Sequence, residues 1–368
     1  MKRRYKIAGW ILGIFGVAFL VLGFVISRNA DCRPAPPLAA GAATMSAVVS
    51  RCYGPPEVLK LERVARPIPA DDQMLVRVRA AAVNPLDWHV MRGEPYPLRL
   101  SAGLGAPTDA AMGVDFSGTV EAVGKSVTRF KPGDEVFGGR TGALAEYVVV
   151  RESRAVALKP ANVSHEEAAA VPVAALTALQ ALREEGKLQA GQKVLINGAS
   201  GGVGTYAVQL AKVMGAEVTG VCSGRNVEMV RSLGADHVID YTKEDFTRAE
   251  TRYDLVVDNI GNHGVSDVVD VLAPKGIYVI VGAPSNDPWI GAISAPIRAS
   301  LYSPFTDHEI KFFIAQMPQS DMEYLASLMR DGKLRSVIDR RYPLAETAEA
   351  IRYLETGRAR GKVIVTVE

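Results

Sequence analysis

The segment that most constrains the fold is a glycine-rich turn at residues 196–204, with the sequence INGASGGVG. An apolar run, KVLI at 193–196, precedes it, and a helix-like run, TYAVQLAK at 205–212, follows it. A strand, a turn and a helix in this order are the context in which a dinucleotide fold binds a pyrophosphate. The pattern therefore predicts a dinucleotide site. The alternative is a tight strand–helix turn that holds no ligand.

The glycines of this turn match a known spacing. Gly201 and Gly204 stand at the second and third glycine positions of G-x-G-x-x-G, and Ala199 stands at the first. The second glycine lets the backbone approach the pyrophosphate, and the third lets the helix pack on the strand. The free N–H groups at the helix N-terminus favour phosphate. We expect the cofactor to contact Ala199, Ser200, Gly201, Gly202, Val203 and Gly204.

The next apolar run, AEVTGVC at 216–222, reads as a second strand that ends near the adenosine ribose. A site that prefers NAD usually has Asp or Glu there to bind the 2′-hydroxyl. This chain has Ser223 and Arg225 instead, and a hydroxyl and a guanidinium can bind a 2′-phosphate. The segment therefore favours NADPH over NADH. Arg225 has an alternative interpretation as a solvated residue of the next helix.

Further apolar runs alternate with helical stretches along the same region. The runs lie at 236–241, 253–259 and 276–282, and the helical stretches at about 226–234 and 264–273. Such alternation predicts a parallel, doubly wound α/β sheet, whose ligands bind at the carboxyl ends of the strands. Residues at these strand ends are candidates for cofactor contacts: Tyr241, Asn259, Gly261 and Gly282.

Length and composition bound the remaining possibilities. The 368 residues exceed one comfortable hydrophobic core, so two domains are expected. With 42 basic and 40 acidic residues, the formal net charge of +2 gives no reason to expect nucleic acid as a partner. The three cysteines, Cys32, Cys52 and Cys222, are widely spaced. Their odd number and spacing argue against a disulfide scaffold and against structural zinc.

The N-terminus carries a long apolar segment. Residues 7–26 contain no charge, and 20 residues in a helix are long enough to cross a bilayer core of ~30 Å. Lys2, Arg3, Arg4 and Lys6 precede the segment. We expect a single-pass membrane anchor over residues 1–26, so that the lipid bilayer is a partner of the chain. An Ala/Pro-rich stretch at 27–44 then reads as a flexible linker.

Three alternatives to an anchor are weaker. A cleaved signal peptide needs a shorter apolar core and a nearby small-residue site, and Ala40-Gly41-Ala42 lies too far downstream. A twin-arginine signal fits poorly because Lys6 stands where an apolar residue belongs. A buried soluble helix would be shorter or amphipathic.

The chain from Met45 to Glu368 resembles the medium-chain dehydrogenase/reductase superfamily, in its zinc-free quinone oxidoreductase (zeta-crystallin-like) branch. The resemblance rests on segments that occur in order along nearly all of the chain after the linker. These segments are residues 53–59, 82–87, 113–120, 131–136, 145–147, 199–204 and 360–363.

The resemblance implies a β-rich, GroES-like catalytic domain that is split by an inserted Rossmann domain. The catalytic domain would comprise residues 45–175 and 320–368, and the NADP-binding Rossmann domain residues 176–319. The active site would lie in the cleft between them. An alternating run, LVRVR at 75–79, independently supports the β-rich part.

The chain departs from zinc-dependent relatives at the ligand positions. Asn84 stands where those relatives have a cysteine ligand, and Val114-Asp115 stands in place of a His-Glu pair. Valine and asparagine are not ligands that a catalytic zinc uses. We therefore expect no metal site.

Without a Lewis acid, the easier chemistry is delivery of a hydride from NADPH to a quinone or an α,β-unsaturated carbonyl. The resemblance implies that Asn84 faces the nicotinamide or substrate and that Tyr96 lines the pocket, where it would donate a proton. It also makes Thr177 and Lys362 cofactor contacts. Tyr96 has the alternative of a packed ring in a rigid loop, and Thr177 that of an ordinary helix residue.

Two other functions remain open. One is an NAD(P)-dependent alcohol or aldehyde dehydrogenase, which the missing zinc ligands disfavour. The other is a membrane-tethered NADPH-binding sensor or scaffold with little catalysis. For an enzyme of this kind we expect a small-molecule electrophile as the substrate. A homodimer is a possible assembly.

Membrane orientation is where two arguments disagree. The basic residues before the apolar segment put the N-terminus in the cytoplasm and the enzyme on the far side. NADPH, however, is a cytosolic reductant, so we expect the catalytic domain to face the cytoplasm. A further alternative is that Met45 is the functional start, which would remove the anchor.

Overall fold

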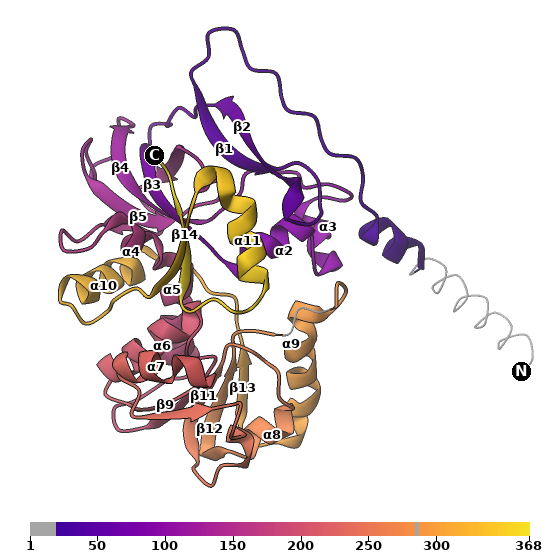
Figure 1. The fold of residues 1–368 in the computed structure, drawn as a ribbon, viewed down its shortest axis with the longest axis vertical. Coiled ribbons are helices and arrows are strands. Elements are labelled where there is room, and N and C mark those ends of the chain that lie inside the picture. Colours follow the sequence, from indigo (N-terminus) through magenta and orange to yellow (C-terminus); the bar gives the residue numbers. More distant parts are fainter. Residues whose placement is uncertain (1–19, 284–286) are drawn as a thin grey trace, which may run out of the picture.

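The computed structural model describes residues 20–283 and 287–368 and divides them into two sheet-centred parts (Figure 1). The part drawn below is the nucleotide-binding region predicted from the glycine turn. In the described chain it contains six parallel strands in the order β10-β9-β8-β11-β12-β13. The strands are β8 (Lys193–Asn197), β9 (Glu217–Cys222), β10 (His237–Asp240), β11 (Tyr253–Asp258), β12 (Leu272–Ile280) and β13 (Glu309–Phe312).

Helices cover both faces of this sheet. Val194 and Ile196 pack with the helices on one face, whereas Leu195 packs with those on the other. Both faces of β8 are therefore buried, which explains why its residues 194–196 form a continuous apolar run. The helices are α5 (Pro172–Gln180), α6 (Gly202–Val213), α7 (Val227–Ser232), α8 (Val265–Val269) and α9 (Gly291–Tyr302). Helix α10 (Gln319–Arg330) packs on α5 and on strand β7 of the β-rich part. The predicted doubly wound α/β fold is confirmed.

The second part is β-rich, and both ends of the described chain contribute to it. Its main sheet runs β14-β15-β3-β4-β5-β7 in the described residues, with β6 also paired to β3. Its strands are β3 (Gln73–Val83), β4 (Asp115–Val123), β5 (Glu135–Gly139), β6 (Tyr147–Arg151), β7 (Val156–Leu158), β14 (Ile338–Pro343) and β15 (Lys362–Thr366). The hairpin of β1 (Thr44–Ser50) and β2 (Leu59–Ala65) and the helices α2 (Pro85–Arg92), α3 (Arg99–Ala102), α4 (His165–Ala169) and α11 (Thr347–Glu355) complete it.

The N-terminal region departs from the sequence expectation in two ways. Residues 20–27 form a helix, and residues 7–19 of the expected anchor lie outside the described residues. Within 20–283 and 287–368, no helix is long and apolar enough to cross a membrane. Cys32 and Cys52 form one disulfide, which the odd number and wide spacing of the cysteines did not lead us to expect. The cysteines meet because the stretch after the helix runs back along the β-rich part, where Arg33 N–H donates to the Arg51 carbonyl at 3.0 Å.

Candidate active site between the two sheets

The glycine turn joins the carboxyl end of β8 to the first residue of α6. Gly204 packs so closely that a Cβ there would lie 2.1 Å from the Gly198 carbonyl oxygen. At Gly201 the nearest atom to such a Cβ is 3.5 Å away, an ordinary van der Waals distance, so the backbone there is not crowded. Only a turn with this asymmetry leaves room for a phosphate while the helix packs against the strand. Gly201 and Gly204 therefore differ in how closely they are packed, and the phosphate role of Gly201 stays a prediction.

The last strand of the β-rich part meets this turn. Gly361 N–H donates to the Ser200 carbonyl at 2.9 Å, and Gly361 pairs with Gly201 as an isolated bridge. The side chain of Lys362 then passes over the start of α6, where its Cδ would lie 3.3 Å from a Cβ at Gly202. A chain segment from the catalytic part thus closes one side of the predicted phosphate site.

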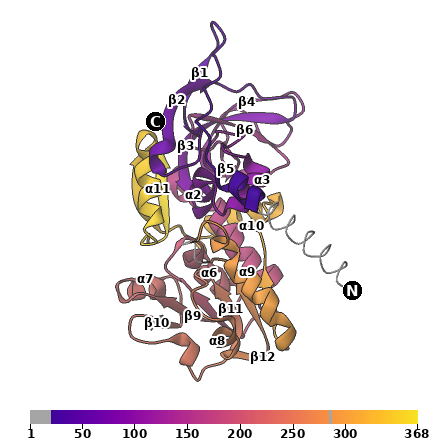
Figure 2. The same ribbon diagram turned by 90° about the vertical axis from the view of Figure 1, so that its right-hand side faces the viewer.

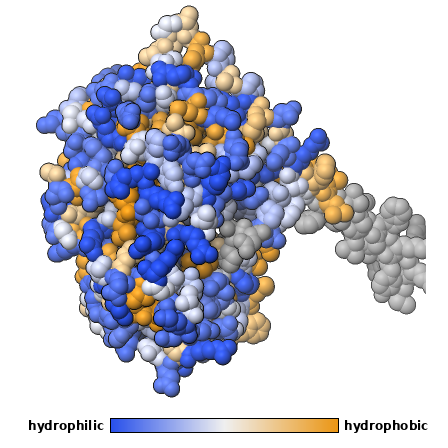
Figure 3. All heavy atoms as spheres, viewed as in Figure 1, coloured by the Kyte–Doolittle hydropathy of each residue, from blue (hydrophilic) through white to orange (hydrophobic). Residues whose placement is uncertain are grey.

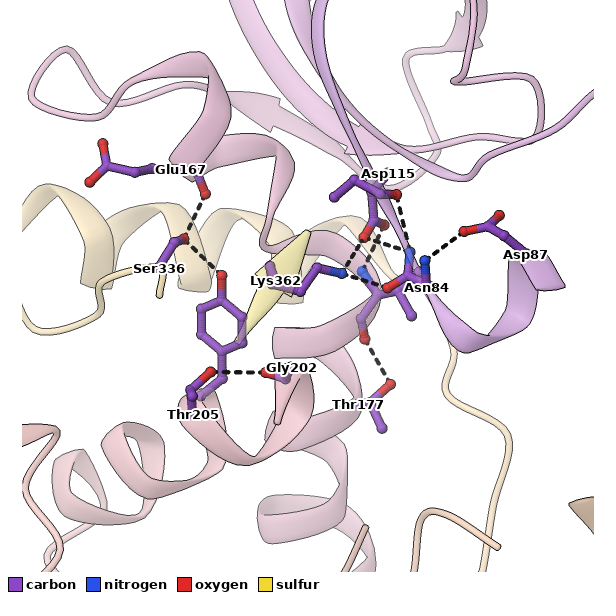
Figure 4. Close-up of polar contacts among 12 residues, drawn as sticks. Asn84, Asp87, Asp115, Glu167, Thr177, Gly202, Thr205, Ser336 and Lys362 are labelled. Carbon is purple, nitrogen blue, oxygen red and sulfur yellow. Dashed lines mark hydrogen bonds and ion pairs between the residues drawn. The ribbon is translucent and has the colours of Figure 1, made fainter. Parts of the chain in front are cut away.

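A buried polar network begins at Lys362 (Figure 4). Lys362 Nζ donates to Asn84 Oδ1 at 2.5 Å and to Asp115 Oδ2 at 3.2 Å. Asn84 Nδ2 donates to Asp115 Oδ2 at 2.9 Å. The network is almost fully shielded from solvent, with Lys362, Asn84 and Asp115 being 3 %, 2 % and 0 % exposed. An ammonium and a carboxylate can remain buried only when they are paired and hydrogen-bonded, as in this network.

The elements around the network explain its geometry. Asn84 lies between β3 and α2, and its N–H donates to Asp87 Oδ2 at 2.7 Å in the first turn of that helix. Asp115 opens β4 and accepts from Val173 N–H at 2.9 Å through its other oxygen, Oδ1. The carboxamide of Asn84 itself is hydrogen-bonded at both ends, by Lys362 at its oxygen and by Asp115 at its nitrogen. The structure makes Asn84 part of a fixed network rather than an open pocket residue.

Burial controls the two carboxyl groups near Asn84. Burial, together with a smaller effect of the neighbouring Asp115 carboxylate, raises the pKa of Asp87 to about 7, against the hydrogen bond from the Asn84 N–H. Burial also raises the pKa of Asp115, although the Lys362 ammonium opposes that shift. Such perturbed groups cluster where a fold builds a functional site.

The raised pKa of Asp87 predicts a pH dependence of stability. Between about pH 4 and 7, folded Asp87 holds a proton that the unfolded chain releases. The stabilisation is complete below about pH 4 and is lost as the pH rises through 7. Asp87→Asn has no carboxyl group to titrate at this position. Between pH 5 and 8 the free energy of unfolding of the wild type should therefore fall relative to that of the variant. Urea titrations at both pH values measure it, with the exposed Asp307→Asn as control. Parallel curves for Asp87→Asn and wild type would contradict the buried, protonated carboxyl.

The two other residues assigned from the resemblance lie in different surroundings. Thr177 is one turn along α5 from Val173, and its hydroxyl donates to the Val173 carbonyl at 2.7 Å. It is therefore close to the network (Figure 4). The ring of Tyr96 packs edge-on against Trp289, with centroids 5.0 Å apart, and the guanidinium of Arg99 lies over it. No polar contact among the described residues joins Tyr96 to Lys362.

The ribose end of the predicted site has an additional residue. Asn226 is buried and donates to Ser200 Oγ at 3.0 Å and to Ser223 Oγ at 3.2 Å. Within the described chain its Oδ1 has no hydrogen-bond partner. A buried acceptor without a partner costs free energy unless a ligand donates to it. A ribose hydroxyl is a donor of the required kind.

Of the two residues expected to recognise the 2′-phosphate, Ser223 is partly buried and Arg225 lies at the surface. Arg225 is exposed and donates to the Arg358 carbonyl at 2.9 Å. The carboxylate of Asp240, at the end of β10, lies beside Gly224, where a Cβ would be 2.6 Å from its Oδ2. Tyr241 follows it and is exposed. This surface therefore combines a guanidinium with a carboxylate that the local sequence pattern did not reveal.

The other end of the site is formed by the ends of β11 and β12. A Cβ at Gly282 would lie 2.1 Å from the Asn259 carbonyl oxygen, and one at Gly261 would lie 2.6 Å from the Gly282 carbonyl oxygen. Asn259 Nδ2 donates to the Asn197 carbonyl at 2.9 Å, while its buried Oδ1 has no partner among the described residues. A carboxamide-bearing ring could supply the missing donor. Asn226 Oδ1 and Asn259 Oδ1, which have no partner among the described residues, and the uncrowded backbone at Gly201 fit a nicotinamide dinucleotide.

Asp115 and Asn226 were not predicted from the sequence as residues of this site. For Asp115 a signal existed, since a carboxylate at the start of an apolar strand is seldom buried without a partner. Nothing near Asn226 in the sequence points to its burial. In the described part of the chain, no group of three or more histidine, cysteine or carboxylate side chains could hold a metal ion.

Two family models match the chain. An "Alcohol dehydrogenase GroES-like domain" matches residues 70–160, and a "Zinc-binding dehydrogenase" model matches residues 233–365. The first covers most of the β-rich part, and the second covers the end of the nucleotide-binding region and the last strands.

Individual relatives extend the similarity. The chain is 36% identical over 328 residues to the 2-methylene-furan-3-one reductase of Solanum lycopersicum, covering 85% of this chain and 76% of the relative. It is 35% identical over 325 residues to a chloroplastic quinone-oxidoreductase homolog of Spinacia oleracea, covering 85% and 95%. The solved quinone oxidoreductase of Coxiella burnetii superposes with a TM-score of 0.77 at 33% identity, covering 89% of this chain and 100% of that one.

Proposed function

Because the chain belongs to the medium-chain dehydrogenase/reductase superfamily and is an oxidoreductase, we propose that it reduces a quinone or an α,β-unsaturated carbonyl with NADPH. The observation that carries the proposal is the junction of Lys362 with the glycine turn. The Lys362 side chain lies beside the predicted phosphate site and also belongs to the buried network with Asn84 and Asp115. The names of the tomato and spinach relatives support the substrate class.

The chain's own residues supply the binding groups. Gly201 leaves space for the pyrophosphate, and the N-terminus of α6 offers N–H groups to it. Lys362 adds a positive charge beside this turn. Asn226 and Asn259 offer acceptors at the two ends. The bound nicotinamide would supply the hydride.

The remaining chemistry requires orientation and stabilisation of negative charge. In a conjugated carbonyl or quinone the acceptor carbon is already electrophilic, so the protein needs only to hold the pair and to favour the developing oxyanion. The Lys362 ammonium is the cation of the network, and Asn84 and Asp115 fix its position. Asn84 and Val114 cannot replace zinc ligands, so we propose that the reaction proceeds without zinc.

A turnover assay tests the proposed function. The full chain is mixed with NADPH and, separately, with quinones, enones and simple aldehydes, and loss of nicotinamide absorbance is followed by stopped flow. We expect turnover with quinones or enones and none with aldehydes. Turnover restricted to aldehydes would favour the dehydrogenase alternative. Tight NADPH binding with no turnover would favour a sensor or scaffold.

The NADPH preference is a separate proposal with its own prediction. Arg225 and Ser223 support it, while the nearby Asp240 carboxylate acts against it. We expect NADPH to bind at least about tenfold more tightly than NADH, a difference of about 1.4 kcal/mol. Arg225→Ala should remove most of this difference without weakening NADH, as measured by fluorescence titration of both nucleotides. Equal affinities in the wild type would refute the preference.

We also propose that residues 1–26 anchor the enzyme to a membrane, with the catalytic part facing the compartment that supplies NADPH. The Cys32–Cys52 disulfide supports the opposite orientation, since disulfides persist in oxidising compartments. Protease treatment of intact spheroplasts decides between them. A C-terminal tag should remain protected, and its digestion from outside would overturn the inward orientation. A tag recovered entirely in the soluble fraction would remove the anchor.

The domain boundaries remain part of the proposal. We divide the chain after residues 175 and 319, where it passes from the β-rich part into the nucleotide-binding region and back. A homodimer and the assigned roles of Tyr96, Thr177, Tyr241, Gly261 and Gly282 also remain proposals.

A further inference from the structure

The helix at residues 20–27 exposes an apolar surface. Leu20 is 72 % exposed and Phe24 64 %, and Val21, Leu22 and Val25 are also exposed. Figure 3 shows this helix as an apolar projection on the side of the molecule. An isolated helix with such a surface is not stable in water by itself, so it needs both an attachment and a cover.

Arg99 supplies the attachment. Its side chain is buried, and Nη1 donates to the carbonyls of Ile26 at 3.2 Å and Ser27 at 3.1 Å, at the C-terminal end of the helix. The last carbonyls of a helix have no partner within it, and a cation there also favours the helix dipole. The guanidinium lies between the rings of Tyr53 and Tyr96, with its Cζ 4.5 Å and 4.6 Å from their centroids. The helix end is therefore fixed to the loop that carries Tyr96.

The same helix touches the nucleotide-binding part. A Cβ at Gly23 would lie 3.3 Å from the Trp289 ring, which packs edge-on against Tyr96. Tyr96 N–H also donates to the Pro288 carbonyl at 2.7 Å. The helix thus lies where the loop of the β-rich part meets the segment before α9. The resemblance makes Tyr96 a residue that lines the substrate pocket, so the helix would lie at the mouth of that pocket.

Other exposed apolar side chains lie on this side of the molecule. Figures 1 and 2 both place α3, α9 and the helix at 20–27 on one side. The exposed apolar residues of these elements and of the loops next to them are Leu100, Leu104, Trp289, Ile290, Ile297, Leu301 and Phe305. An exposed apolar surface on this scale marks a contact with another molecule or a membrane.

The sequence indicates what covers this apolar surface. The uncharged run at 7–26 includes the exposed turns of this helix, and Lys2, Arg3, Arg4 and Lys6 precede the run. Apolar residues in such a run, with basic residues before it, are typical of a segment that enters a bilayer. Arg99 fixes the C-terminal end of the helix, so the point where the chain would leave the bilayer lies beside Tyr96 and Trp289.

We propose that the apolar surface of the helix at 20–27 and α9 rests on a lipid bilayer, so that a lipid-soluble quinone or enone enters the active site from the membrane. The proposal rests on the proposed function for the substrate's reacting group. The membrane proposal adds that this substrate carries a long apolar tail. A long-chain quinone partitioned into lipid then reaches the pocket mouth without crossing water.

The first test measures contact with lipid and does not depend on catalysis. The full chain with Trp10→Phe and Trp88→Phe retains Trp289 as its one tryptophan. It is reconstituted into phosphatidylcholine vesicles with bromine on the acyl chains, and retained NADPH binding shows that the protein is folded. We expect Trp289 to lose most of its fluorescence relative to unbrominated vesicles. Unchanged fluorescence together with full quenching by aqueous iodide would overturn the proposal.

The second test measures substrate delivery in unbrominated vesicles. Leu301→Glu should raise the KM for a long-chain quinone by about tenfold because a carboxylate opposes lipid contact. Its KM for a short, water-soluble quinone should not change. Ile68→Glu, an equally drastic change at an exposed site after β2, is the matched control and should affect neither substrate.

The outcomes separate the two proposals. Equal effects of Leu301→Glu on both quinones, or no effect on either, would overturn delivery from the membrane. Failure of the wild type to reduce any quinone or enone would overturn the proposed function, while Trp289 quenching would still decide whether the surface contacts lipid.

Discussion

Gly201→Val is expected to abolish NADPH binding in a protein that remains folded. A Cβ at Gly201 would lie no closer than 3.5 Å to a protein atom, which is ordinary van der Waals contact, so we expect the fold to tolerate the substitution. The valine side chain would instead fill the volume that the pyrophosphate requires. Fluorescence titration measures the affinity, and circular dichroism with thermal unfolding measures the fold. Micromolar NADPH affinity in the folded variant would contradict our placement of the site.

Gly204→Val is the matched control, because the same substitution three residues later should destabilise the fold itself. A Cβ there would lie 2.1 Å from the Gly198 carbonyl oxygen, which belongs to the backbone and cannot rotate away. We expect destabilisation of about 1–3 kcal/mol or more from overpacking. If the two variants behave alike, Gly201 and Gly204 do not have separate roles in phosphate binding and helix packing.

The second large effect is expected at the buried ion pair. Asp115→Leu leaves the Lys362 ammonium 3 % exposed and without its carboxylate. Breaking a buried pair by removing one partner costs about 3–5 kcal/mol. The double variant Asp115→Leu with Lys362→Met replaces both charges with apolar groups and should recover much of this loss. Both variants should lose turnover, because the cation near the turn is displaced in one and absent in the other.

Chemical denaturation of the wild type, both single variants and the double variant gives the coupling energy directly. We expect the double variant to be more stable than Asp115→Leu alone. Additive losses would mean that Lys362 and Asp115 do not stabilise each other and that the network is not a unit.

The nucleotide-binding region was largely predictable because its signals are local. Strand β9 at 217–222 and strand β11 at 253–258 lie within one residue of the expected runs, and α7 lies within the expected helical stretch. Each is a short apolar or helical run that ends at a turn, so neighbouring residues carry the information. Strand β13 escaped prediction because it is a short edge strand in which charged and apolar residues alternate over only four positions.

The network of Lys362, Asn84 and Asp115 was not predictable from local patterns. Lys362 is 278 residues from Asn84 and 247 from Asp115 in sequence. Their contact depends on a strand that returns from the nucleotide-binding region to pair with β3, a pairing that no local pattern specifies. The role of Arg99 is similar, since its partners lie in a helix more than 70 residues earlier. The family resemblance located Asn84 and Lys362 but did not reveal that they touch.

The most direct measurement of the central claim is the fate of the transferred hydrogen. The full chain is incubated with NADPH that carries deuterium at the transferable position of the nicotinamide, and with an enone that it turns over. We expect the saturated ketone to carry one deuterium at the β-carbon, because the alkene is the electrophile. Deuterium at the carbonyl carbon of an alcohol product would instead identify an alcohol dehydrogenase and would contradict the account.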